Sequence, residues 1–213
     1  MDNAGSAGIT ITMLLISSVF MGATIFNVAS NETDDNLSEN DLAELAQQVT
    51  DETVDKITTY LEAPYTLGKF YGPAHHQKIE KIVIMVESMI SKDITMSELT
   101  IELYNGNSVR ILSYSGYAEP VGSNDVFEHP IWNSITDNTF GIIVSYDKDN
   151  SLIDYDIIND RTDKAFLAIK LPENMAMSKG DIMTVILSPS NGITRTLELE
   201  APLPMKSVVN FGL

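Results

Sequence analysis

The sequence contains no cysteine among its 213 residues. Disulfide bonds, a thiol nucleophile and a cysteine-ligated zinc site are therefore excluded. Basic residues are also scarce, with 13 lysines and arginines against 30 acidic residues and a formal net charge of −17. Nucleic acids and anionic membrane surfaces are bound by clustered lysine and arginine, so neither class of partner fits this balance.

The shortage of basic residues is greatest at the N-terminal end, where residues 1–55 contain ten acidic residues and no lysine or arginine. Within this region residues 8–30 form an uncharged, apolar run of 23 residues. As a helix this run is about 34 Å long, enough to cross a hydrocarbon layer of about 30 Å. A secretory signal has a shorter apolar stretch after a basic start, so a removable signal peptide fits poorly.

The apolar run is rich in small and hydroxyl side chains, including Ser18 and Gly22, which are four residues apart. Small residues at this spacing let helices approach closely. The run therefore predicts either a plain single-span anchor or a helix that leaves lipid and packs against copies of itself. A helix that is apolar all round is buried on every side, in lipid or in protein.

The segment "SAGITITMLLISSVFMGATIFNVAS" resembles the N-terminal segment of archaellins, the archaeal flagellins of the type IV pilin-like superfamily. In that family a prepilin peptidase cuts after a glycine, and the mature chain continues as a long apolar helix. The resemblance implies cleavage between Gly5 and Ser6. It also implies that the helix packs in a filament core through Gly8, Ile9, Leu14, Leu15, Ser18, Val19, Gly22, Ile25 and Phe26.

The C-terminal part supports the same resemblance. The stretch Ile94–Gly106 looks like an archaellin strand, and residues 159–213 look like the family's C-terminal end. That end includes the Gly-Asp turn and the "SPSNG" hairpin. Each motif is weak alone, but their order along the chain is specific.

Residues 38–63 show apolar positions at helical spacing and an acidic first turn, which predicts an amphipathic helix ending before Pro64. This helix is either a stalk that extends the apolar rod or a helix packed on its own domain. Beyond Pro64 the pattern alternates, and seven strands are expected at residues 78–88, 97–105, 108–116, 140–147, 164–171, 181–189 and 193–201. The predicted fold is α+β: an N-terminal helical segment (1–63) with the apolar helix 8–30 and the stalk 38–63, then an antiparallel immunoglobulin-like β-sandwich (64–213).

Catalytic and metal-binding motifs are scarce, and no cofactor, enzyme activity or regular metal site is expected. His75, His76 and His129 are interpreted as surface-loop residues, because their spacing does not suit a shared metal ion. Asp147, Asp149 and Ser151 match the first positions of a calcium loop, but Leu152 and Ile158 break the EF-hand pattern. An irregular calcium site and a solvated acidic turn stay open as alternatives.

Two glycosylation sequons begin at Asn31 and Asn36, just past the apolar run. Archaellins are commonly glycosylated, so the resemblance makes both residues acceptor candidates in an extracellular glycoprotein.

The resemblance predicts a structural subunit that is inserted in the cytoplasmic membrane and then polymerises into an extracellular archaellum filament for swimming motility. Its partners would be copies of itself, sister archaellins, an assembly motor and a prepilin peptidase. One alternative is a non-rotating adhesive pilin. The other is a monomeric membrane-anchored ectodomain with a ligand in the loop 117–140, which carries Trp132 but equally suits a packed crossover.

Overall fold

The structure is a computed structural model that describes residues 44–51, 53, 60–73, 77–90, 92–123, 125–203 and 207–211. The chain divides into two units, residues 1–55 and residues 56–213. In the first unit residues 44–51 and 53 are helical, within the range of the predicted stalk. Among the described residues no helix is both long and apolar enough to cross a membrane. The predicted apolar helix 8–30 lies outside the described residues.

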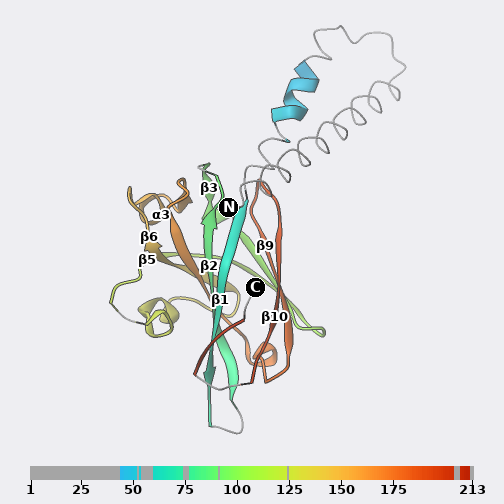
Figure 1. Ribbon diagram of the computed structural model, residues 1–213, viewed down its shortest axis with the longest axis vertical. Coiled ribbons are helices and arrows are strands. Elements are labelled where there is room, and N and C mark those ends of the chain that lie inside the picture. Colours follow the sequence, from blue (N-terminus) through green and yellow to red (C-terminus); the bar gives the residue numbers. More distant parts are fainter. Residues whose placement is uncertain are drawn as a thin grey trace, which may run out of the picture. The chain divides into compact units, whose positions relative to one another are not determined.

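The second unit is mostly β-structure, as the alternating pattern predicted (Figure 1). Short helices interrupt the strands at α3 (Ser151–Asp154) and at four 3-10 turns, η1 (Met96–Glu98), η2 (Val126–Glu128), η3 (Pro130–Asn133) and η4 (Glu173–Met175). The strands are β1 (Leu61–Tyr71), β2 (Lys78–Ser88), β3 (Ile94–Thr95), β4 (Thr100–Tyr104), β5 (Val109–Pro120), β6 (Thr139–Tyr146), β7 (Ile157–Ile158), β8 (Lys164–Lys170), β9 (Ile182–Ser188), β10 (Arg195–Glu200) and β11 (Val208–Asn210).

Hydrogen bonds join nine of the described strands into one sheet, in the order β10-β9-β4-β5-β6-β8-β2-β1-β11, and β3 pairs with β7 apart from it. The long strand β5 belongs to both halves of this sheet. Residues 109–112 pair antiparallel with β4, whereas residues 113–120 pair parallel with β6. The prediction of an all-antiparallel sandwich is therefore wrong at β5–β6, where the two strands run parallel. Two parallel strands cannot be joined by a short hairpin and need a crossover connection.

Both halves of the sheet contribute to one large apolar core, called core 1 here. Ile101, Val185 and Leu197 enter it from β4, β9 and β10. Ile82, Ile142 and Leu167 enter it from β2, β6 and β8. These side chains occupy alternate positions of their strands, so the sheet buries one face of each half around the same core.

A second, smaller core covers the opposite face of β2, β6 and β8. This core 2 consists of Val83, Phe127, Ile131, Trp132, Ile135, Ile143 and Ala168. Three of the strands' own residues form its floor, and the crossover from β5 to β6 (residues 121–138) supplies the rest. The crossover thus packs against this face of the sheet. Because it returns the chain to the starting end of β5, β6 can run parallel to β5.

The amphipathic helix predicted to end at Ala63 does not extend that far, because β1 already begins at Leu61. Leu61 and Ala63 are buried in core 1 and Glu62 between them is not, which is the two-residue period of a strand. Pro64 is accommodated at a bulge, where the β1–β2 register shifts between Glu62 and Tyr65. A bulge spares proline the ladder hydrogen bond that it cannot donate.

Most of the strands predicted from alternation are present with shifts of a few residues at their ends. The prediction for residues 78–88 matches β2 at both ends. The hairpin predicted around Gly106 joins the antiparallel pair β4–β5, and Gly106 has the positive φ of 88° that such a turn favours. The strands β1, β3, β7 and β11 were not predicted.

Candidate functional site

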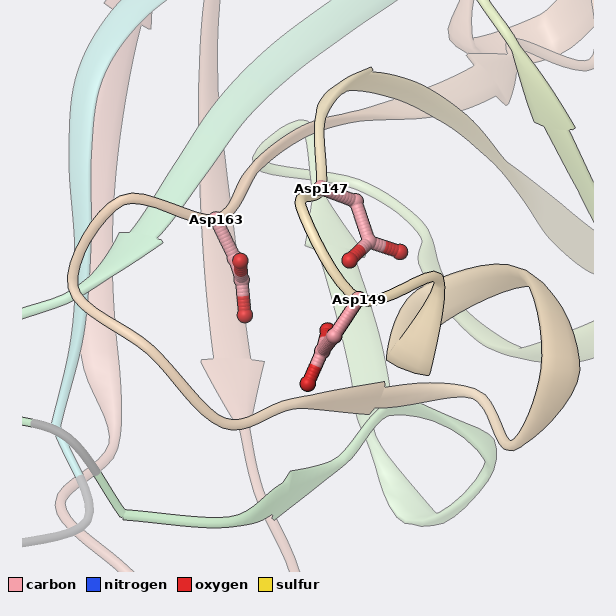
Figure 2. A group of neighbouring side chains, drawn as sticks. All are labelled: Asp147, Asp149 and Asp163. Carbon is pink, nitrogen blue, oxygen red and sulfur yellow. The ribbon is translucent and has the colours of Figure 1, made fainter.

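Three carboxylates lie together between β6 and β8 in the second unit (residues 56–213), which we call the strand unit. Asp147 follows the last residue of β6, Asp149 lies two residues later, and Asp163 directly precedes β8. One ligand oxygen from each lies within 4.8 Å of the others. Figure 2 shows the three side chains gathered in the space between the two chain segments that carry them.

Backbone amides orient each carboxylate in this acidic cluster. The Leu152 N–H donates to Asp147 Oδ2 at 2.9 Å, and the Ser151 N–H donates to Asp149 Oδ1 at 3.2 Å. Asp163 Oδ2 accepts from two consecutive amides, those of Asn159 and Asp160, at 3.0 and 2.9 Å. The positions of the carboxylates are therefore set by the turns around them rather than by contacts among the carboxylates.

Two of the carboxylate oxygens are buried without a partner. Oδ1 of Asp163 and Oδ1 of Asp147 accept no hydrogen bond from the described residues. The Asp163 side chain is only 1% exposed. Burying a carboxylate oxygen without a hydrogen-bond partner costs folding free energy. Asp163 Oδ1 is therefore an acceptor that could bind a ligand at the most buried of the three carboxylates.

The pKa values of the cluster diverge according to exposure. Burial raises the pKa of Asp147, the Leu152 N–H opposes that shift, and the nearby charges of Asp163 and Asp149 add to it. Donation from Asn159 Nδ2, at 2.9 Å, holds the pKa of the exposed Asp149 at about 2. The three carboxylates thus crowd negative charge into one small region.

The chemistry of this donor set suits a hard divalent cation, which binds several oxygen ligands. The third carboxylate, Asp163, comes from beyond the loop that carries Asp147 and Asp149. Sequence reasoning missed Asp163, since it lies 14 residues after Asp149. The signal that would have found it is an aspartate directly before a strand that is a neighbour of β6.

The segment that carries the cluster is fixed to the rest of the unit. The Tyr114 hydroxyl on β5 donates to Asp156 Oδ1 at 2.6 Å, and the Met96 N–H donates to the Asp156 carbonyl at 2.7 Å. The strand pair β3–β7 adds a further attachment. Asn150 and Asp156 both have positive φ, of 62° and 57°, a conformation that these residue types tolerate.

The crossover at residues 121–138 lies within the loop 117–140 that was considered as a ligand site from the sequence, and it uses its aromatic side chains for packing. Trp132 stacks on Phe127 with ring centroids 6.3 Å apart, and its Nε1 donates to the Val126 carbonyl at 2.8 Å. Lys81 Nζ lies 4.8 Å from the centroid of the Trp132 ring and donates to the Phe127 carbonyl. Burial lowers the pKa of Lys81.

The prediction that His129 is a surface residue is wrong, because its side chain is buried in the crossover. Its Nδ1 accepts from the Ile131 N–H at 3.2 Å, and its Nε2 lies 3.0 Å from the Pro120 carbonyl. The imidazole therefore caps η3 and joins it to the end of β5. His75 and His76 lie outside the described residues.

The residues predicted for processing, helix packing and glycosylation also lie outside the described residues. These are Gly5, Ser6, Gly8, Ile9, Leu14, Leu15, Ser18, Val19, Gly22, Ile25, Phe26, Asn31 and Asn36.

Comparison with known proteins identifies similar chains in archaeal filaments. Flagellin B3 of Methanocaldococcus jannaschii is 27% identical over 208 residues, which cover 93% of this chain and 88% of that protein. The crystal structure of archaeal flagellin FlaB1 from the same organism has a TM-score of 0.62 at 19% identity, covering 70% of this chain and 94% of that one. The chain resembles the archaellins.

A second solved structure, the archaeal flagellum of Methanospirillum hungatei, has a TM-score of 0.51 at 10% identity and covers 98% of this chain and 99% of that one. At this identity the likeness concerns the fold alone. No family model matches the chain. The archaellin resemblance therefore rests on the nearly full-length sequence similarity to Flagellin B3 and on the fold shared with the solved archaeal flagellins.

Proposed function

We propose that this chain is a structural subunit that polymerises through its N-terminal hydrophobic helix into an archaellum filament used for swimming. The similarity to Flagellin B3 over 93% of the chain carries this proposal, since it extends through both the apolar run and the strand unit. The subunit itself catalyses nothing. Motility comes from rotation of the whole filament by a motor.

The apolar helix 8–30 is the assembly element in this proposal. Apolar surface is worth about 25 cal/mol per Å² when it is kept from water, and the helix keeps that surface buried first in the cytoplasmic membrane and then in a bundle of copies. Packing of small residues such as Ser18 and Gly22 then favours the bundle over lipid. A prepilin peptidase cuts after Gly5, so that Ser6 begins the mature chain, and an assembly motor extracts the subunit.

The strand unit forms the outer part of the extracellular filament, as an immunoglobulin-like sandwich around core 1. The contribution of both halves of the sheet to that core supports this arrangement. Asn31 and Asn36 follow the apolar run and are the proposed glycan acceptors. The net charge of −17 keeps neighbouring filaments apart in solution.

Electron microscopy of material sheared from producing cells tests the proposal, together with mass spectrometry of the N-terminus. We expect long filaments made of this chain, with residues 8–28 at their axis and Ser6 as the first residue. Gly22→Leu should abolish filaments, because the larger side chain separates the helices, whereas Gly22→Ala should retain them. Single copies dispersed in detergent extracts, with no filaments from the unsubstituted chain, would instead indicate an anchored ectodomain.

A further inference from the structure

One sheet face of the strand unit points away from core 1 and exposes apolar side chains among acidic ones. It is formed by the outward positions of β4, β9, β10 and residues 109–113 of β5. Ile111 is 60% exposed and Val109 56% exposed, and Tyr104 and Ile182 are exposed beside them. Tyr104 lies directly opposite Val109, so these side chains form one continuous patch. We call it the acidic face, because its charged residues are Glu102, Glu198 and Glu200.

A second exposed apolar patch lies on the other half of the sheet, beside the crossover. Tyr65 on β1 and Tyr146 on β6 are 54% and 52% exposed. The half-buried Phe166 on β8 lies between them and also packs against core 2. Lys164 is the cross-strand partner of Tyr146 and pairs with Glu87 at 2.8 Å. We call this patch the tyrosine–lysine face.

We propose that the acidic face of one subunit docks on the tyrosine–lysine face of the next copy of this chain. The proposal rests on the proposed function, because it concerns how outer units meet in the filament. A patch that met itself would close a two-fold dimer, whereas contact between two different patches continues as an open helical assembly. A contact between two unlike surfaces is thus compatible with a filament, and the strand unit presents two exposed apolar patches.

Charge favours this pairing over a contact of the acidic face with itself. Self-contact would bring the three glutamates of one copy near the same three glutamates of another, in a chain that is already strongly acidic. On the tyrosine–lysine face, Lys164 lies among the exposed tyrosines, and its side chain is 42% exposed although it pairs with Glu87. Glu62 and Glu87 are the acidic residues on that part of the sheet, at the cross-strand positions beyond Tyr65 and Met85. In the contact, Glu102 would share Lys164 with Glu87.

Engineered cysteines test the contact in assembled filaments, because the chain has no cysteine of its own. Full-length Ile111→Cys and Tyr146→Cys chains are co-assembled and treated with a short flexible bis-maleimide. We expect a cross-linked dimer on denaturing gels from the mixed filaments and none from filaments of either variant alone. Tyr155→Cys is the matched control, since Tyr155 is 71% exposed but lies outside both faces, and its mixture with Ile111→Cys should give no dimer.

The outcomes separate the two proposals. Filaments without a specific dimer band, or a band from Ile111→Cys alone, would overturn the docking and leave the filament function standing. Absence of filaments from the unsubstituted chain would overturn the function itself.

Charge exchange provides a second measurement that needs no cross-link. Glu102→Lys and Lys164→Glu should each lower the temperature at which filaments dissociate, and the double variant should recover most of that shift. If Lys164→Glu acts only by breaking the Lys164–Glu87 pair within one copy, adding Glu102→Lys should not restore the dissociation temperature. A double variant that fails to recover would therefore also overturn the docking.

Discussion

Gly141 is the point at which the crossover lies closest to the sheet. A Cβ atom added there would lie 2.7 Å from Ile131 Cδ1, 2.9 Å from Ile131 Cγ1 and 3.0 Å from Ile135 Cγ2. Its cross-strand partner is Ala168, another small residue in the floor of core 2. We predict that Gly141→Ala lifts the crossover and destabilises the strand unit, because two branched side chains cannot both move within a packed layer.

The magnitude follows from two opposing effects. Overpacking a buried site costs about 1–3 kcal/mol. Replacing glycine by alanine where φ is ordinary returns about 0.4–1 kcal/mol by restricting the unfolded chain, and Gly141 does not have a positive φ. The expected loss is therefore about 1.3 kcal/mol in the free energy of unfolding, the difference between the midpoints of these two ranges.

Guanidinium unfolding of the full-length chain in mild detergent, followed by fluorescence, measures this loss. Trp132 is the only tryptophan and lies in the crossover, so its emission should also shift to the red in the folded variant. Ile131→Val removes the nearest atom, and the double-mutant cycle should show a favourable coupling of at least about 0.5 kcal/mol.

Gly68→Ala provides the matched control for the crossover. A Cβ there meets Phe211 at 2.9 Å, a comparably tight contact with a residue packed on core 1 rather than on core 2. It should lower stability without shifting the Trp132 emission. An unchanged unfolding midpoint in Gly141→Ala, or equal emission shifts in both variants, would refute the reasoning.

Three further predictions concern the acidic cluster and its attachment. Calcium at 100 times its dissociation constant should add about 2.7 kcal/mol and raise the Tm by about 5–10 °C; scanning calorimetry should show no such rise for Asp163→Asn, and an equal rise would exclude Asp163 as a ligand. The pKa of Asp149 is about 2 in the fold and about 3.9 when unfolded, so its stabilisation is complete above about pH 4 and is lost as the pH falls toward 2. The guanidinium midpoint of Asp149→Asn should fall less over that range than the midpoint of the unsubstituted chain, and parallel curves would contradict this assignment. Tyr114→Phe removes the hydrogen bond to Asp156 and should cost about 1.5–3 kcal/mol of unfolding free energy, whereas Tyr117→Phe, on the exposed part of β5, should cost little.

Local pattern was sufficient to predict strands whose residues alternate between the two faces of the sheet. The alternation at residues 78–88 indicated β2 because Ile82, Ile84 and Val86 point into core 1 while their neighbours face the other side. β1 was missed because Pro64 usually ends a regular element, and the bulge that tolerates it depends on pairing with β2. The pairing partner is not visible in the local sequence.

The acidic cluster shows the same limit for a site. Asp147 and Asp149 were recognised because a short spacing in one loop is a local signal. Asp163 joins them only because β6 and β8 are neighbours in the sheet, and their pairing brings the end of one strand beside the start of the other. The burial of His129 was missed for a related reason, since a residue before proline in a loop looks exposed until the crossover is known to pack on core 2.

The strand β5 links the topology that sequence reasoning missed to the two outward faces. Its first residues pair with β4 and extend the acidic face, and its later residues pair in parallel with β6, which ends at the tyrosine–lysine face. A purely antiparallel connection would place β6 next to β5 through a short hairpin, with no crossover to cover the sheet beside Phe166. The crossover covers the part of β2, β6 and β8 that forms the floor of core 2, and it leaves Tyr65 and Tyr146 exposed to solvent. The crossover from β5 to β6 therefore determines which part of this sheet face is buried and which part stays exposed for contact with another copy.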